Sequence, residues 1–197
     1  MIILDLTRNL YMCVPNALKA WPQIKHSNAD LACALTKAGL RVEWPQGGHL
    51  SYQPPPKPLG DIGEPPKAKL CWRDVGEAAI ATIDLWVNYR ARSLSQLITL
   101  VERSGAREGQ MADADHACDL ARRFQTWIVL APVSGKCLAR SFMLLRYLHR
   151  KGLRANWVFG VRSWPFRAHC WIQADQIVLD DAHERLIAYE PILAVRA

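Results

Sequence analysis

A proline-rich segment divides this chain and excludes regular structure from part of it. Seven of the twelve prolines fall between Pro45 and Pro66. Because proline fixes φ and donates no backbone hydrogen bond, this stretch is expected to form neither a helix nor a central strand, and to act as a semi-rigid linker. We therefore predict an N-terminal module over residues 1–44, a linker over 45–67 and a C-terminal domain over 68–197.

The N-terminal module begins with two short β-prone runs. Ile2–Leu6 and Leu10–Val14 are separated by a polar turn, which predicts a β-hairpin. Two short helices are expected to follow, and the second covers Ala29–Ala38, where apolar residues recur at helical spacing before Gly39. A module of about 45 residues buries too little surface to be comfortably stable alone. It is therefore expected to lean on another domain, a partner or a bound peptide.

The C-terminal domain changes its hydrophobic period along the chain. Helices are predicted over Ala78–Val87, Leu94–Val101, Met111–Phe124 and Gly135–Arg150. The last of these has Ser134 as its N-cap and Gly152 as its stop. Strands are predicted over Asn156–Val161, Ala168–Gln173 and Ile177–Leu179. Helices followed by an antiparallel meander place the domain in the α+β class.

Composition excludes several classes of protein. Hydrophobic residues make up 50% of the chain, which excludes disorder of the whole. No apolar run is long enough to cross a bilayer, and Asp5 interrupts the start before a signal peptide could form. The six cysteines show no C-x-x-C spacing, so we expect reduced thiols in a cytoplasmic protein. The candidate catalytic residues described below do not stand at zinc-type spacing, and no metal is expected.

Positive charge is concentrated in one part of the sequence. Ten Lys or Arg residues and no Asp or Glu lie between Leu120 and Ala174, in a chain of formal net charge +7. Single charges of this kind are usually solvated, but the block favours an anionic partner or an ionised nucleophile nearby. Nucleic acid is not the expected partner, because the sequence has no zinc pattern, no RNP-type strand and no dense Lys/Arg run.

Cys137 is the candidate nucleophile. It lies three residues after Ser134, in the first turn of a predicted helix, where unpaired backbone N–H groups and the helix dipole stabilise a thiolate. Lys136 and Arg140 flank it, and both favour ionisation. The alternative is a buried cysteine that packs as a small hydrophobe.

His169 is the candidate base, because it stands inside an otherwise apolar strand; the alternative is a structural core histidine. The next residue, Cys170, is expected to face away from it and to be dispensable. A turn of three residues after this strand places Asp181 opposite His169, whereas a two-residue turn brings Asp180 diagonally onto the shared face. Geometry slightly prefers Asp181, and both stay open. The order Cys, His, Asp suits a nucleophile, a base and an orienting group.

Several motifs together resemble a known family. They are Cys137–Ser141, Leu148–Ala155, Gly160–Arg162, Pro165–Phe166, Ala168–Trp171 and Asp180–Ala182, within residues 119–195. In this order and spacing they resemble the transglutaminase-like leader peptidases of lasso-peptide biosynthesis, the B proteins of the McjB type. The resemblance implies a papain-like cysteine protease fold with a triad of Cys137, His169 and Asp181, and it chooses Asp181 over Asp180.

The N-terminal module is similar to the PqqD-like, winged-helix module of that family, which captures a leader peptide as an added strand. The matching signature is Ile3–Leu6 followed by Tyr11, although the family has a further strand before this hairpin. The resemblance and the rules of strand addition imply leader contacts along one strand and one helix. The expected contact residues are Leu10, Tyr11, Met12, Cys13 and Val14 of the strand and Leu31 and Leu35 of the helix.

The resemblance implies removal of the leader from a ribosomally made lasso precursor peptide, so that an asparagine-synthetase-like cyclase can close the macrolactam ring. Any ATP dependence is expected through that synthetase, because this chain has no phosphate-binding G-x-x-x-x-G-K-[ST] loop, and no cofactor is expected to bind it directly. Two alternatives stay open. One is a transglutaminase-like acyltransferase with the same triad, and the other is a non-catalytic leader-binding chaperone with an inert thiol.

Overall fold

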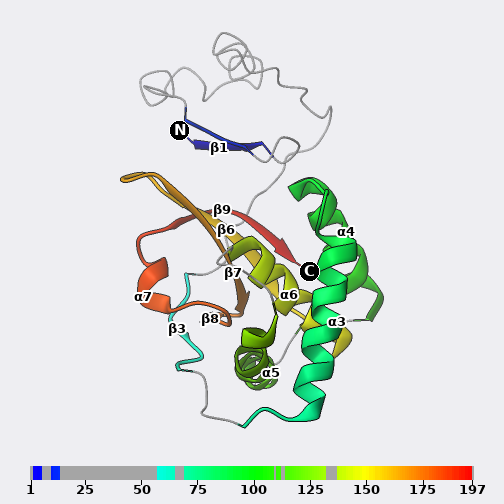
Figure 1. Cartoon of the computed structure of the whole chain (residues 1–197). Helices are drawn as coiled ribbons and strands as arrows, with labels where there is room; N and C mark the ends of the chain where they lie inside the picture. The colour runs from blue at the N-terminus through cyan, green and yellow to red at the C-terminus, as the bar shows by residue number, and fades with distance from the viewer. Residues whose placement is uncertain are drawn as a thin grey trace. The chain divides into compact units, whose positions relative to one another are not determined.

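The computed structural model describes residues 2–5, 10–13, 57–64, 69–108, 110–111, 114–131 and 137–196 (Figure 1). The chain divides into two units, residues 1–52 and 53–197. In the first unit, β1 (Ile2–Asp5) pairs antiparallel with β2 (Leu10–Cys13). The predicted hairpin is therefore confirmed. The helix predicted over Ala29–Ala38 lies outside the described residues, as do the expected leader contacts Val14, Leu31 and Leu35.

The second unit combines helices with a five-stranded sheet, which confirms the α+β class. Its helices are α3 (Trp72–Asn88), α4 (Leu94–Glu108), α5 (Ala114–Trp127), the 3-10 turn η1 (Ile128–Leu130), α6 (Cys137–Arg150) and α7 (His183–Leu186). The four predicted helices are all present. Within the described residues, no helix has both the length and the apolar character that crossing a bilayer requires.

The main sheet has the strand order β3-β8-β7-β6-β9. Its strands are β3 (Gly60–Asp61), β6 (Asn156–Arg162), β7 (Arg167–Ala174), β8 (Ile177–Val178) and β9 (Glu190–Arg196). The predicted antiparallel meander of β6, β7 and β8 is confirmed. At one edge, β3 lies parallel to β8 although it belongs to the proline-rich segment. A position at the edge of the sheet suits a proline-rich segment, because one side of an edge strand needs no backbone donors.

A second, two-stranded sheet explains a small error in the helix prediction. Met111 was expected to begin a helix, but it belongs to β4 (Gln110–Met111), which pairs parallel with β5 (Leu153–Arg154). The helix α5 therefore starts later, at Ala114. The predicted end of α6 is confirmed: the helix stops at Arg150, and Gly152 takes the left-handed conformation with φ of 76°, which glycine adopts at little cost.

The turn between β7 and β8 has two residues, so the preferred three-residue turn is wrong. Gln173 pairs with Val178 and Ala174 with Ile177, leaving Asp175 and Gln176 in the turn. Asp175 has φ of 49°, a left-handed conformation that aspartate tolerates. The backbone N–H of Leu179 still donates to the Ile172 carbonyl at 2.9 Å, but the ladder then ends. Beyond this point the edge of β7 that faces β8 is open.

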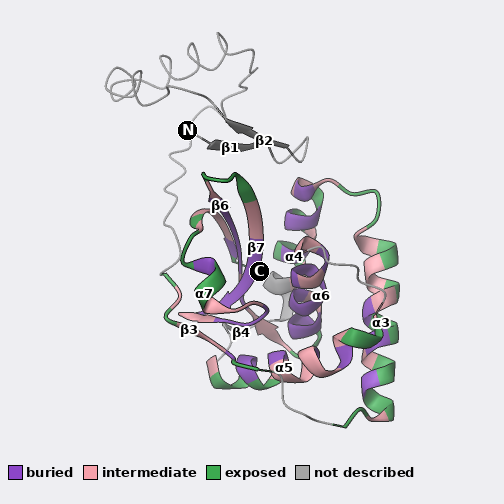
Figure 2. Ribbon diagram, turned by 60° about the vertical axis from the view of Figure 1, so that its left-hand side comes forward, coloured by how far each residue is buried: buried purple, intermediate pink, exposed green. Residues whose placement is uncertain are grey.

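α6 covers one face of the main sheet and packs against β7 (Figure 2). The helices α3, α4 and α5 pack around α6 in turn, so that most of α6 is buried. On the other face of the sheet, Leu186 of α7 joins a core cluster with Val158, Trp171 and Val178. Residues on both faces of β7 are therefore held firmly, which fixes the strand that carries His169.

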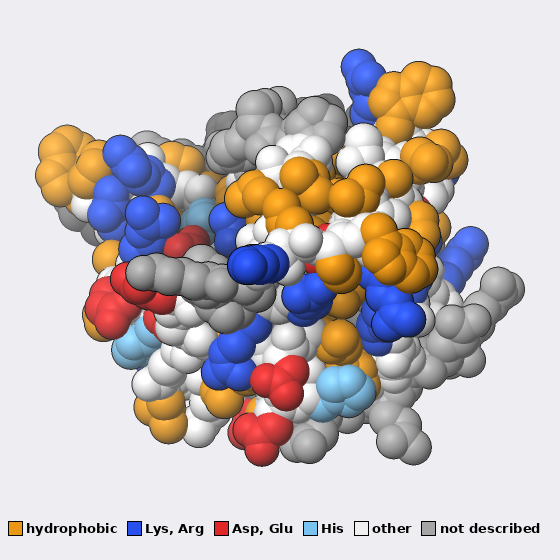
Figure 3. Space-filling model, turned by 60° about the horizontal axis from the view of Figure 1, so that its bottom comes forward, with side chains coloured by type: hydrophobic (Ala, Val, Ile, Leu, Met, Phe, Trp, Pro, Cys, Tyr) orange, Lys and Arg blue, Asp and Glu red, His pale blue; other side chains and the backbone are white. Residues whose placement is uncertain are grey.

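Ion pairs from α3 neutralise part of the basic block. Three carboxylates of this helix hold four basic side chains of α5, α6 and the residue after α6. The pairs are Arg123–Asp74 at 2.8 Å, Arg146–Asp84 at 2.9 Å, Arg150–Glu77 at 3.2 Å and Lys151–Glu77 at 2.7 Å. Figure 3 shows Lys and Arg side chains spread over one face beside a band of exposed hydrophobic side chains. The charge imbalance of the sequence segment is thus smaller in the folded domain.

Replacing Gly160 by alanine is expected to destabilise the fold. A Cβ atom at this position of β6 would lie 2.8 Å from two ring carbons of Trp171 and 3.2 Å from the Glu190 carbonyl oxygen. The Trp171 ring is fully enclosed and cannot swing away. We expect Gly160→Ala to lower the free energy of unfolding by about 1–3 kcal/mol, measured by urea denaturation.

Gly76→Ala is the matched control, and we expect the opposite sign. Gly76 is exposed inside α3, and a Cβ there would meet nothing within 4 Å. Alanine should raise the free energy of unfolding by up to about 1 kcal/mol, because it favours a helix over glycine. Equal effects of the two substitutions would contradict the close packing of Trp171 over Gly160.

Candidate active site

A cavity of about 350 Å³ lies where the first turn of α6 meets the open edge of β7. Its lining includes the three residues proposed from the sequence as a triad and both candidate aspartates. The lining residues are Ile128, Val129, Cys137, Arg140, Ser141, His169, Cys170, Asp180, Asp181 and Arg185. The fold therefore collects one thiol pair, one imidazole, two carboxylates and two guanidinium groups around a single space.

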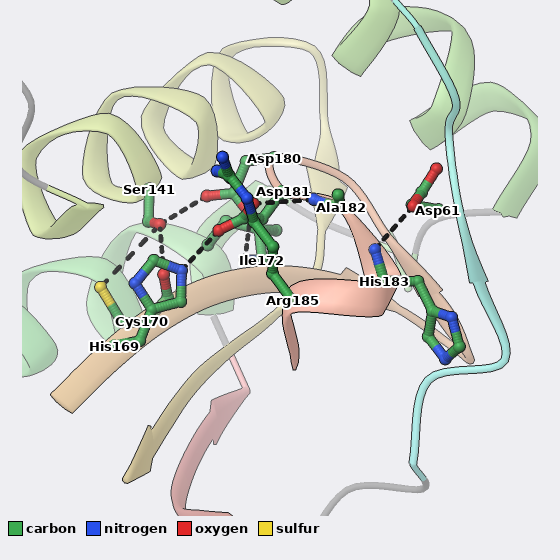
Figure 4. A network of polar contacts seen from close by, with 10 residues as sticks. All are labelled: Asp61, Ser141, His169, Cys170, Ile172, Asp180, Asp181, Ala182, His183 and Arg185. Carbon is green, nitrogen blue, oxygen red and sulfur yellow. Dashed lines mark hydrogen bonds and ion pairs between the residues drawn. The ribbon is translucent and has the colours of Figure 1, made fainter. Parts of the chain in front are cut away.

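His169 is hydrogen-bonded to Asp181. The distance between His169 Nε2 and Asp181 Oδ2 is 2.6 Å (Figure 4). The other carboxylate oxygen of Asp181 accepts from the Ala182 backbone N–H at 2.8 Å and lies 3.5 Å from the Arg185 guanidinium. Burial would raise the pKa of Asp181, but these hydrogen bonds and the charges of His169 and Arg185 lower it. Asp181 is therefore a charged partner for the imidazole.

Asp181 reaches His169 in spite of the two-residue turn, which the register argument did not anticipate. Strand parity with this turn puts Asp180 on the shared face. The ladder ends after Leu179, however, so parity no longer governs where the next side chains point. The His169 ring also packs on Tyr189 at 5.5 Å and on Trp171 at 6.4 Å between ring centroids. These contacts fix the plane of the ring.

The Cys137 sulfur sits in a strongly stabilising environment. A hydrogen bond from the Cys170 thiol has the largest effect on the pKa of Cys137, which is lowered to about 4. Burial opposes this effect, while hydrogen bonds from His169 and from the Cys170 backbone, together with the charge of the imidazole, add to it. At neutral pH the sulfur is therefore a thiolate.

The pKa of His169 moves in the opposite direction. Burial alone would lower it, but hydrogen bonds with Asp181 and Cys137, together with their negative charges, raise it to about 9. With Nε2 bonded to Asp181, the second ring nitrogen is the one available to Cys137. The resting site is thus a thiolate and an imidazolium held side by side.

Asp180 has a different environment from Asp181. Its buried carboxylate accepts a hydrogen bond from Ser141 Oγ at 2.5 Å and one from the Ile172 backbone N–H at 2.8 Å. In a longer β8, the backbone of Leu179 would satisfy that N–H, so the carboxylate takes the place of a strand. Burial raises the pKa of Asp180 to about 6, although both hydrogen bonds lower it. Sequence reasoning did not anticipate this role.

Cys170 and Ser141 are site residues that sequence reasoning missed. Cys170 was expected to face away from His169, with which it alternates along the strand, and to be dispensable. It does lie on the α6 side, where the Ser141 hydroxyl is 3.4 Å from its carbonyl oxygen. The expected orientation away from His169 is therefore confirmed, whereas the dispensability of Cys170 stays a prediction. Cys170 nevertheless acts on the nucleophile, because its hydrogen bonds lower the pKa of Cys137.

Some sequence-predicted features are not tested here. Three residues before α6 lie outside the described residues. They are Ser134, expected as the N-cap, Gly135, expected to begin the helix, and Lys136, expected to favour ionisation of Cys137. Arg140 does line the cavity. The strand residues Leu10–Cys13 are described as part of β2 in the other unit. Among the described residues, no group of three or more His, Cys, Asp or Glu side chains is arranged to hold a metal ion.

Comparison with known proteins identifies the superfamily of the C-terminal domain. Residues 79–194, more than half of the chain, match the family model of the transglutaminase-like superfamily. A stretch of 46 residues, 23% of this chain, is 39% identical to the "Microcin J25-processing protein McjB" of Escherichia coli. The match spans 22% of that protein's length, about a fifth. No solved structure matches.

The lowered pKa of Cys137 predicts unusual reactivity at acid pH. Iodoacetamide labelling of Cys137, followed by mass spectrometry of its peptide, is expected to reach half of its maximal rate near pH 4. Buried Cys118 is the internal control, because its pKa is raised and it should label only under alkaline or unfolding conditions. A midpoint for Cys137 close to that of an ordinary thiol, at 9.0, would contradict the proposed ion pair.

Proposed function

The chain belongs to the transglutaminase-like superfamily, and on that basis we propose that it is a cysteine peptidase that removes the leader from a lasso-peptide precursor. The observation that carries the peptidase proposal is that Cys137, His169 and Asp181 line one cavity, in which His169 Nε2 lies 2.6 Å from Asp181 Oδ2. The pKa of His169 is raised by both Asp181 and Cys137, which agrees with this arrangement. A nucleophile, a proton carrier and an orienting carboxylate in one cavity meet the requirements for covalent acyl transfer.

In the first half of the reaction, the Cys137 thiolate attacks the scissile carbonyl carbon. The imidazolium of His169 then gives its proton to the leaving amine nitrogen as the C–N bond breaks. The products of this half are a thioester on Cys137 and the free amino group of the core peptide. Asp181 keeps the imidazole oriented and stabilises its positive charge.

In the second half, His169 is neutral and takes a proton from water, which attacks the thioester carbonyl. The C–S bond breaks, and the Cys137 thiolate and the imidazolium are restored. The leader leaves as a carboxylic acid, which gives its proton to solvent and becomes a free carboxylate. The backbone N–H of Cys137, at the first residue of α6, is our candidate donor to the oxyanion of both tetrahedral intermediates. Ile128 and Val129 offer an apolar wall beside the reacting atoms.

The choice of substrate rests on the relative and on the sequence resemblance. The printed name of the McjB protein assigns it to the processing of microcin J25, and the shared stretch is short. Among the described residues, β1 and β2 form a sheet of two strands, and an extended leader can add to the edge of such a sheet. In this proposal an asparagine-synthetase-like cyclase uses the freed amine, and any ATP is consumed there.

Loss of the triad side chains is expected to stop cleavage of the precursor. Cys137→Ala and His169→Ala should abolish cleavage, because they remove the nucleophile and the proton carrier. Asp181→Asn should lower kcat by roughly three to four orders of magnitude through a misoriented imidazole. The measurement is mass spectrometry of purified precursor incubated with each variant, and circular dichroism checks the fold. Substantial cleavage by Cys137→Ala would overturn the peptidase proposal.

The fate of the leader carboxyl group separates the proposal from its alternatives. A free leader carboxylate means hydrolysis. A leader joined to an added amine means acyl transfer, and the chain would then be an acyltransferase with the same triad. Precursor that is bound but never cleaved, together with slow labelling of Cys137, would favour a leader-binding chaperone.

Leader recognition is expected to depend on the hairpin. Met12 lies in β2, opposite Ile3, and proline at this position removes one backbone donor from the strand. We expect Met12→Pro to weaken binding of a fluorescent leader peptide by about tenfold or more, since strand addition relies on main-chain hydrogen bonds. The rate of Cys137 labelling should stay unchanged and thereby confirm an intact site. Unchanged leader affinity would place the receptor elsewhere.

A further inference from the structure

The surroundings of Cys170 contain an arrangement that the catalytic steps above do not use. The Cys170 side chain is buried, with 4% of its surface exposed, and it lines the same cavity as Cys137. The backbone N–H and carbonyl of Ile172, two residues later in β7, point toward β8. Those of Cys170 point to the same edge of β7, because backbone groups alternate between the two edges of a strand. The short β8 leaves this edge open at Cys170. Both Cys170 groups therefore need partners from outside the sheet.

Those partners come from α6. The Ser141 hydroxyl lies 3.4 Å from the Cys170 carbonyl oxygen, and the Cys137 sulfur accepts from the Cys170 backbone N–H. Ser141 is itself held by the buried Asp180 carboxylate at 2.5 Å, and Asp180 also binds the Ile172 N–H. Figure 4 shows Ser141, Cys170 and Asp180 together beside His169 and Asp181. The first turns of α6 are thus tied to β7 at Cys170.

The thiol of Cys170 is placed to donate to the nucleophile. Its single proton has two acceptors in reach, the Ser141 oxygen at a long 4.0 Å and the Cys137 sulfur. A thiolate is the stronger acceptor because it is charged. The hydrogen bond with Cys137, burial, and the charges of Cys137 and Asp180 raise the pKa of Cys170, so Cys170 keeps its proton. Of the two sulfurs, Cys137 carries the charge and Cys170 carries the hydrogen.

We propose that Cys170 is a positioning residue that holds the Cys137 thiolate through its thiol and its backbone N–H, supported by Ser141 and Asp180. The inference rests on the proposed role of Cys137 as the nucleophile. In this proposal two sets of residues stabilise the Cys137 thiolate. One is His169 with Asp181, and the other is Cys170 with Ser141 and Asp180. Each set starts at one of two consecutive residues of β7 and ends at one of two consecutive aspartates.

Other charged or titratable groups lie around the two cysteines, and the test keeps them constant. Arg140 of α6 and Arg185 of α7 line the cavity, and Tyr89, which follows α3, interacts electrostatically with both cysteines. None of them is changed by substitutions at Cys170. A shift in the behaviour of Cys137 can then be attributed to the lost thiol.

The test compares donor-free and donor-bearing residues at position 170 in the full chain under reducing conditions. Site-resolved iodoacetamide labelling of Cys137 is followed from pH 3 to 9. We expect Cys170→Ala to raise the pH midpoint by about one unit or more, because a hydrogen bond to a charged group changes an equilibrium by about tenfold or more. Cys170→Ser supplies an O–H donor, and it should restore most of the original midpoint.

Two further variants keep the result decisive. Cys170→Val lacks a donor but fills the buried space and suits a strand, so it replaces the alanine variant if that protein does not fold. Cys118→Ala removes a buried thiol of α5 outside the cavity and should leave the midpoint unchanged. An unchanged midpoint in the donor-free variants overturns the proposal, and so does a serine variant that behaves like alanine. Labelling needs no peptide, so this outcome is independent of whether the precursor is cleaved.

Discussion

The structure of the site depends on the early end of β8. This strand pairs with β7 over only two residues and one further hydrogen bond, which leaves backbone groups of Cys170 and Ile172 without a strand partner. Buried backbone groups must be satisfied, and here side chains do it. The Asp180 carboxylate accepts from the Ile172 N–H in place of a strand carbonyl. Ser141 and Cys137, in the first turns of α6, interact with the backbone of Cys170. The first turn of α6, which carries the nucleophile, therefore packs against the part of β7 that β8 does not cover.

The Cys137 sulfur interacts with two neighbouring residues of one strand, His169 and Cys170. Successive side chains point to opposite faces of a sheet. A group above one face would contact only every second residue, whereas hydrogen bonds from both His169 and Cys170 act on the Cys137 sulfur. His169 is supported by Asp181, Trp171 and Tyr189 on its own face, and Cys170 by Ser141 on the other. The thiolate is consequently stabilised from two directions.

The position of α6 has a second cause, which lies in α3. The carboxylates of Glu77 and Asp84 bind basic side chains at the far end of α6 and in its middle, while the first turn is held by β7. These pairs are partly buried, and breaking one would leave an uncompensated charge, which is costly. The basic residues of this region therefore serve packing between helices at least as much as any field around the nucleophile.

The sequence by itself determined the four helices of the C-terminal domain, the strands of the meander and the hairpin, because each rests on local periodicity. It also singled out Cys137 and His169, since a cysteine at a helix start and a histidine in an apolar strand are local signals. The resemblance to a family, rather than geometry, chose Asp181. Only the tertiary structure showed that the two-residue turn and the Asp181 contact occur together, and that Cys170, Ser141 and Asp180 belong to the site. Parity rules assume that a ladder continues, and here the ladder stops after Leu179.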